Sequence, residues 1–72
     1  MRTVGNFLSL LDRANSLAKE SKDPTLKEVL SAKVDEITKK LLDVSPDFFN
    51  FSHGSQLTNQ EDALYDELES SM

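Results

Sequence analysis

The residues of this chain best suited to catalytic chemistry are one histidine and the two serines beside it. His53 lies between Ser52 and Ser55, in a stretch that also contains a glycine and has the composition of a linker. A serine nucleophile works only where a rigid fold orients it against its base. A single histidine in a chain without cysteine also lacks the other ligands that a metal centre needs. We therefore expect neither a catalytic triad nor a metal site.

Two pairs of adjacent carboxylates are the remaining candidates for acid–base chemistry. They are Asp35 with Glu36, and Glu61 with Asp62. Both pairs fall in stretches with helical periodicity, where neighbouring side chains diverge by about 100° and do not face each other. A phosphate-binding loop needs several glycines close together, and the chain has only two, far apart. The sequence predicts a protein that is not an enzyme and that binds no cofactor.

The charged residues divide the chain into two parts. All eight lysines and arginines lie in residues 1–44, which carry a net charge of +1, whereas residues 45–72 contain six acids and no cation. The overall charge of −5 argues against a nucleic-acid-binding protein, because such a protein needs a basic surface facing the phosphates. An acidic tail could instead imitate a nucleic acid, but six carboxylates form only a modest patch. We expect no nucleic-acid partner and keep mimicry as a minor alternative.

No stretch of the sequence resembles a membrane span or a signal peptide. The longest uncharged run in the first 44 residues, from Thr3 to Leu11, is far shorter than the ~20 apolar residues that cross a bilayer. Asp12 and Arg13 follow this run directly, without the small residues of a cleavage site. We expect a cytoplasmic protein.

Hydrophobic periodicity predicts two long helices joined by a tight turn. The first covers residues 4–20, with Thr3 as its N-cap. The second covers residues 24–44, because Asp23 can cap its free amides and Pro24 fits the first helical position. Its apolar residues recur at spacings of three and four, as in the seam of an antiparallel helical hairpin. The residues expected in the core or a self-association surface are Phe7, Leu8, Leu11, Leu26, Leu30, Val34, Ile37 and Leu41.

The predicted hairpin cannot bury its apolar faces alone. Two helices that touch along one seam leave much of each apolar stripe in water, and a 72-residue chain without disulfides is small for a stable core. A third element must cover the hairpin, either the chain's own tail or a second copy, which would give a four-helix bundle. We expect the protein to bind itself as a dimer or tetramer.

Three of the four phenylalanines lie in a short turn predicted over residues 46–51. Ser45 and Pro46 resemble the start of the second helix, so we expect Ser45 to cap this turn. Two interpretations stay open: the aromatic side chains fold back on the open end of the hairpin, or they form an exposed anchor for a partner. The residues concerned are Phe48, Phe49 and Phe51.

A short acidic helix is predicted over residues 59–69, after a linker over residues 52–58. Thr58 and Glu61 match a capping box at its start. A helix this short is not stable alone in water, so it either rests on the hairpin or folds in an apolar groove of a partner with a basic rim. On the hairpin it could dock through Lys33, Lys39 and Lys40. Its candidate contact residues are Leu64, Tyr65, Leu68, Asp62, Asp66 and Glu67.

These patterns together predict an all-α fold in three parts. A helical hairpin with its aromatic turn forms a body over residues 1–51, followed by the linker over 52–58 and the acidic tail over 59–72. We interpret the chain as a small non-catalytic adaptor, inhibitor or assembly factor. It self-associates through the hairpin and docks on a larger protein through the aromatic and acidic elements. The main alternative is a structural or virion assembly subunit present in many copies.

Overall fold

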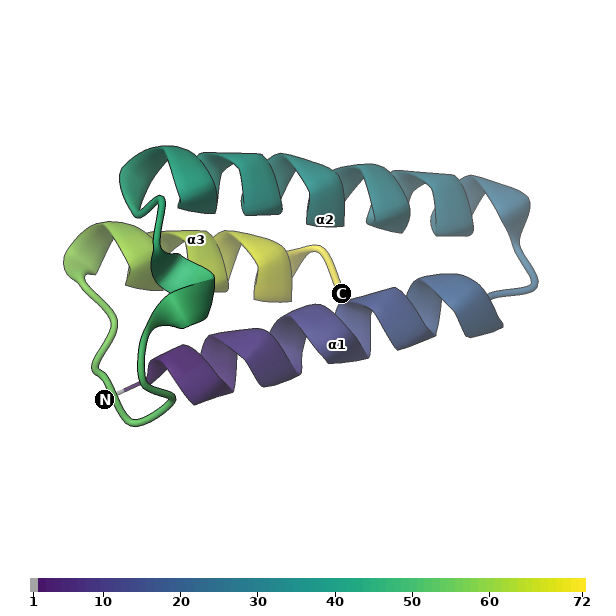
Figure 1. Ribbon diagram of the computed structural model, residues 1–72. Coiled ribbons are helices and arrows are strands. Elements are labelled where there is room, and N and C mark those ends of the chain that lie inside the picture. Colours follow the sequence, from purple (N-terminus) through teal and green to yellow (C-terminus); the bar gives the residue numbers. More distant parts are fainter. Residues whose placement is uncertain (1) are drawn as a thin grey trace.

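The computed structural model describes residues 2–72 and is all-α (Figure 1). Helix α1 spans Val4–Glu20, α2 spans Pro24–Val44, the 3-10 helix η1 spans Phe48–Asn50, and α3 spans Asn59–Ser70. Helices α1 and α2 form an antiparallel hairpin, and α3 packs against the half of it that lies away from the α1–α2 connection. The predicted fold class is confirmed, and the bounds of the first two helices match the prediction. Residue 1 lies outside the described residues.

The predicted N-caps explain where the first two helices begin. The side chain of Thr3 accepts a hydrogen bond from the amide of Asn6, and the Asn6 side chain accepts one in return from the amide of Thr3. At the start of α2, the Asp23 carboxylate accepts hydrogen bonds from the amides of Thr25 and Leu26. A helix leaves its first backbone amides without partners inside the helix. These capping contacts supply partners for them and so determine the residue at which each helix begins.

The core lies where the three helices face one another. Phe7 and Ile37 are fully buried at its centre, whereas Leu8 is only half-buried and Leu26 is 51% exposed. The buried apolar residues are Val4, Phe7, Leu10, Leu11, Ala14 and Ala18 of α1, Leu30, Val34, Ile37 and Leu41 of α2, and Phe48, Leu57 and Leu68. The chain's own tail therefore supplies the third element that the hairpin requires.

The aromatic turn divides its three phenylalanines between the core and the surface. Phe48 is fully buried and packs edge-to-face on Phe7, with 5.4 Å between ring centroids. Phe49 and Phe51 are 48% and 39% exposed, and each forms a T-shaped aromatic pair with Phe48. Both interpretations of the aromatic cluster thus apply, to different residues.

Ser45 does not cap the aromatic turn, which corrects the sequence-based expectation. No side chain among residues 2–72 caps η1. The Ser45 hydroxyl instead donates a 2.7 Å hydrogen bond to the carboxylate of Glu61. A hydrogen bond to an ionised carboxylate is stronger than one between neutral groups, and the fold brings the Glu61 carboxylate within reach of Ser45.

The segment predicted as a linker lies against the start of α1. The amides of Val4 and Gly5 donate to the carbonyls of Ser55 and His53, at 2.8 and 3.0 Å, so the free first-turn amides of α1 find partners there. Thr3 and Gln56 form an isolated antiparallel bridge. The close approach also explains a glycine in a helical first turn: a Cβ at Gly5 would lie 3.1 Å from the His53 carbonyl oxygen. Whether the tail can be separated from the body remains a prediction.

The burial of the hairpin seam makes a testable prediction. Replacing Ile37, which is fully buried, with alanine should lower the free energy of unfolding by about 2–5 kcal/mol, because a cavity is left in the core. The matched control is Leu26→Ala on the same helix, which should cost under ~1 kcal/mol because Leu26 is half-exposed. Urea denaturation measures both. Equal losses of stability in the two variants would contradict the observed orientation of α2, in which Ile37 faces the core and Leu26 is half-exposed.

Candidate interaction surfaces

A buried carboxylate joins α3 to the end of α2. Glu61 is 2% exposed, and its two oxygens accept hydrogen bonds from the Thr58 amide at 2.8 Å and from the Ser45 hydroxyl at 2.7 Å. The Thr58 side chain accepts from the Glu61 amide, which completes the predicted capping box. Every polar group of Glu61 is satisfied, so this site positions α3 and offers no free chemistry.

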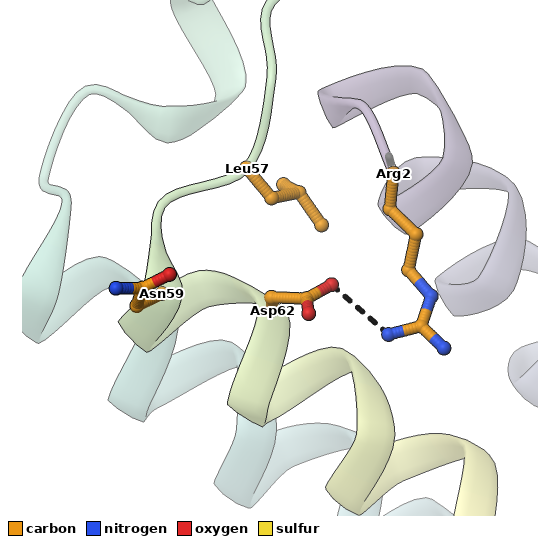
Figure 2. Close-up of a pocket in the computed structure, with 4 residues that line it drawn as sticks. All are labelled: Arg2, Leu57, Asn59 and Asp62. Carbon is orange, nitrogen blue, oxygen red and sulfur yellow. Dashed lines mark hydrogen bonds and ion pairs between the residues drawn. The ribbon is translucent and has the colours of Figure 1, made fainter.

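Arg2 ties the start of the chain to α3. Its guanidinium lies 2.9 Å from the Asp62 carboxylate and 2.7 Å from that of Asp66, and it stacks 4.3 Å above the Tyr65 ring. Figure 2 shows the contact between Arg2 and Asp62, which together with Leu57 and Asn59 line an open cavity of about 580 Å³. The hydrogen bond to Asp62 raises the pKa of Arg2. Because two carboxylates already neutralise Arg2, the cavity presents no free positive charge to an anion.

Lysines of α2 hold the other side of α3. The Glu67 carboxylate lies 3.1 Å from the Lys33 ammonium and 3.5 Å from that of Lys40, and Glu36 of α2 contacts the same two lysines. The prediction that the tail docks on the hairpin's lysines is confirmed for these two. Lys39 forms no ion pair with any residue from 2 to 72.

The ion-pair network shifts the titration of both of its glutamates. The hydrogen bond from Lys33 lowers the pKa of Glu67, and the charges of Lys33 and Lys40 act in the same direction. The same hydrogen-bonding lysine lowers the pKa of Glu36. A lowered folded-state pKa contributes stability above the ordinary glutamate pKa, and this contribution is lost as the pH falls through the lowered value. Acid should therefore loosen α3 from α2.

Removing Lys33 tests this network. In Lys33→Ala the pKa of Glu67 should rise toward the ordinary value for glutamate, because its nearest cation and hydrogen-bond donor is gone. Lys39→Ala is the matched control, since it removes the same charge from the same helix without touching Glu67. Carboxyl NMR titration measures the pKa in each variant. An equal Glu67 pKa in both variants would show that the Lys33 contact does not persist in solution.

The predicted contact residues of the tail are largely occupied within the chain. Leu68 is fully buried, and Leu64 and Tyr65 pack against the core. The three exposed or half-exposed acids proposed for the tail's contacts pair with cations of the same chain: Asp62 and Asp66 with Arg2, and Glu67 with Lys33 and Lys40. They do not form the row of unpaired carboxylates that a nucleic-acid mimic presents.

Two surfaces remain on which large apolar side chains are exposed. The first, which we call the aromatic surface, consists of Phe49 and Phe51. The second, the distal surface, surrounds the C-terminal end of α3, where two shallow cavities of about 370 and 470 Å³ meet at Ser71. The apolar residues of the distal surface are Leu17, Leu26, Val29, Leu30, Ala32 and Met72.

The distal surface exists because α3 is shorter than the helices it covers. Helix α3 has 12 residues, against 17 in α1 and 21 in α2, and it ends well before the α1–α2 connection (Figure 1). Beyond its end, Leu17 is 42% exposed, Val29 is 59% exposed and Met72 is 41% exposed. The apolar stripes of α1 and α2 thus continue where no helix of the described chain covers them.

Residues with catalytic or ligand-binding potential are not brought together. His53 is exposed in the segment between η1 and α3. Among residues 2–72 there is no group of three or more acidic, histidine or cysteine side chains that could hold a metal ion, and no buried side-chain nitrogen or oxygen lacks a hydrogen-bond partner. Over the same residues, no helix has the length and apolar character needed to cross a membrane.

Sequence reasoning missed two features of these surfaces. It assigned no role to Arg2, whose contacts with α3 bridge some sixty positions of sequence and leave no local pattern. It also did not identify the distal surface. The signal was present in the expected length of the last helix, because a helix over residues 59–69 can cover only about half of a hairpin whose second helix spans 24–44.

Comparison with protein-family models, curated protein sequences and solved structures finds no significant match.

Proposed function

We propose that this protein is a small non-catalytic protein–protein interaction module. It self-associates through the distal surface of its hairpin and docks on a larger protein through its aromatic surface. The proposal keeps the adaptor, inhibitor or assembly role that the sequence favours.

The distribution of exposed apolar side chains carries this proposal. Among residues 2–72, the large apolar side chains that remain exposed fall at the two ends of the hairpin and not between them. Those at the connected end are Leu17, Leu26, Val29 and Met72, and those at the open end are Val44, Phe49 and Phe51. Scattered exposed leucines are ordinary on a protein surface, whereas apolar residues gathered in patches are typical of interaction sites.

The aromatic surface has the properties of an anchor for a partner. Phe49 and Phe51 are held in place by contact with the buried ring of Phe48, so little side-chain freedom is lost when they are covered. Rigid aromatic side chains are enriched among the residues that dominate binding energy. The exposed acids Asp43 and Asp47 flank this turn in sequence. The partner expected here has an apolar groove with a basic rim.

The experiment compares capture by the native chain with capture by a Phe49→Ser/Phe51→Ser variant. Both side chains are partly exposed, so the variant should keep its fold, which circular dichroism checks. Asn50→Ser is the matched control, because Asn50 is exposed in the same turn. Immobilised proteins are exposed to an extract of the organism that encodes the chain, and bound proteins are quantified by mass spectrometry.

The expected result is a protein bound at a fixed ratio by the native chain and by Asn50→Ser but lost from the double variant. A loss of about tenfold or more in affinity is expected, because two anchors are removed together. If the same proteins bind all three baits equally, the aromatic surface is not the docking site.

A further inference from the structure

We infer that the distal surface is covered by a second copy of this chain in a two-fold arrangement, in which each molecule fills the layer that the other lacks. The inference rests on the proposed self-association and specifies its geometry. On the face of the hairpin where α3 lies, the molecule forms a step. Three helices are present at the open end of the hairpin, and only α1 and α2 at the connected end (Figure 1).

A step of this kind is complementary to itself. When a second molecule is turned end for end and laid face to face on the thin half, its hairpin occupies the layer that α3 leaves empty. Each α3 then meets the connected end of the other hairpin. The thin halves form a local four-helix bundle, with α1 antiparallel to α1 of the second copy and α2 antiparallel to α2. The side chains covered are those of the distal surface.

The charges beside the distal surface suit this arrangement. Arg13, Leu17 and Glu20 occur at spacings of four and three, so they share one side of α1. Leu17 and Glu20 line the cavity at the distal surface. A two-fold axis crossing α1 at the level of Leu17 places Arg13 near Glu20 of the second copy, and Glu20 near Arg13 of the second copy. Both residues are exposed, and neither forms an ion pair with any residue from 2 to 72.

The second helix suits the same axis. Across the hairpin, Leu17 lines the same cavity as Leu26 and Leu30, and Val29, which lies between them in sequence, is the most exposed large apolar residue of α2. An axis at Val29 sets that residue against its own copy. The axis set by the charges of α1 therefore also covers the exposed apolar residue Val29 of α2.

The size of the step limits the strength of the dimer. Helix α2 exceeds α3 by nine residues, 21 against 12, which is a difference of about 14 Å in length. We expect an interface at or below the ~1,200 Å² that marks the lower end for specific complexes. The expected dissociation constant is about 1 μM or weaker, so the dimer should form and dissociate with concentration.

Charge exchange tests the arrangement. The full chain and the variants Arg13→Glu, Glu20→Arg and the double variant are compared by sedimentation equilibrium, with circular dichroism as a check of folding. Each single change places like charges together twice in the dimer and should raise the dissociation constant about tenfold. The double variant restores opposite charges and should dimerise nearly as the native chain does. Val29→Glu, at an exposed position, should abolish the dimer.

The outcomes separate this arrangement from the proposed function. Rescue by the double variant supports the two-fold step. A native dimer unaffected by all four changes overturns the step while leaving self-association intact, because the copies then meet elsewhere. A native chain that stays monomeric at every concentration overturns both the step and self-association through the hairpin, whereas the variants of the aromatic surface test docking separately.

Discussion

A chain that ends at Gln56 should lose its cooperative unfolding transition. The deletion removes Leu57 and Leu68, both buried, and uncovers the core against which Leu64 and Tyr65 pack. At ~1.5–3 kcal/mol for each fully buried leucine, with smaller terms for the partly buried pair, the loss is on the order of 6 kcal/mol. The total stability of a small domain is about 5–15 kcal/mol, so little or none should remain. Thermal melting followed by helical circular dichroism measures the effect.

A second deletion serves as the control for this result. A chain that ends at Ser70 loses only Ser71 and Met72, which are exposed, and should keep a cooperative transition close to that of the full chain. A cooperative transition in the chain that ends at Gln56 would contradict the role of α3 as a core helix. The body and tail would then be separable, as the division at residues 51–58 predicts.

Replacing Phe48 with alanine should be among the most destabilising single changes in the chain. Its ring is fully buried against Phe7, and removing a buried phenylalanine costs about 3–5 kcal/mol. Phe49→Ala is the matched comparison, since the same side chain is removed from the next residue of the same turn. Because Phe49 is 48% exposed, its loss should cost under ~1 kcal/mol. Urea denaturation gives both values.

The two variants also separate folding from recognition. Phe49→Ala should weaken docking on a larger protein while leaving the midpoint of unfolding nearly unchanged, whereas Phe48→Ala acts through stability. Similar losses of stability in both variants would show that the turn is packed differently, with Phe49 buried as deeply as Phe48.

The helices could be predicted from sequence because local residues determine their ends. Asp23 and Pro24 occupy adjacent positions that are typical of the start of a helix, and the observed α2 begins at Pro24. The Thr58 capping box likewise placed the start of α3 at Asn59. The last helix ends at Ser70, one residue beyond the prediction, where no strong stop signal is present.

Contacts between distant residues could not be predicted in the same way. The missing side chain of Gly5 makes room for the His53 carbonyl, a contact that no local pattern indicates. Ser45 had the local pattern of a cap and is used instead by Glu61, sixteen positions later. In each case the partner is set by how the tail crosses the start of α1 and the end of α2.

The candidate interaction residues were predicted as groups but not ranked within them. An irregular turn has no periodicity that distinguishes Phe48 from Phe49 and Phe51, so only the fold reveals which one is buried. The apolar face of α3 has the same pattern whether it covers its own hairpin or a partner's groove. The charged residues of the tail could be assigned more directly than its apolar residues. Glu67 pairs with Lys33 and Lys40, two of the three lysines that the sequence suggested for docking of the tail.

The most direct test of the account is the solution mass of the full chain, measured by light scattering over a wide range of concentration, beside Val29→Glu. The chain has a mass of 8.1 kDa, and self-association through the distal surface predicts that the measured mass rises toward twice this value or a small multiple of it as concentration increases. Val29→Glu should remain near 8.1 kDa. Open-ended growth would favour the many-copy assembly subunit, and a native chain that stays at 8.1 kDa at every concentration would contradict self-association.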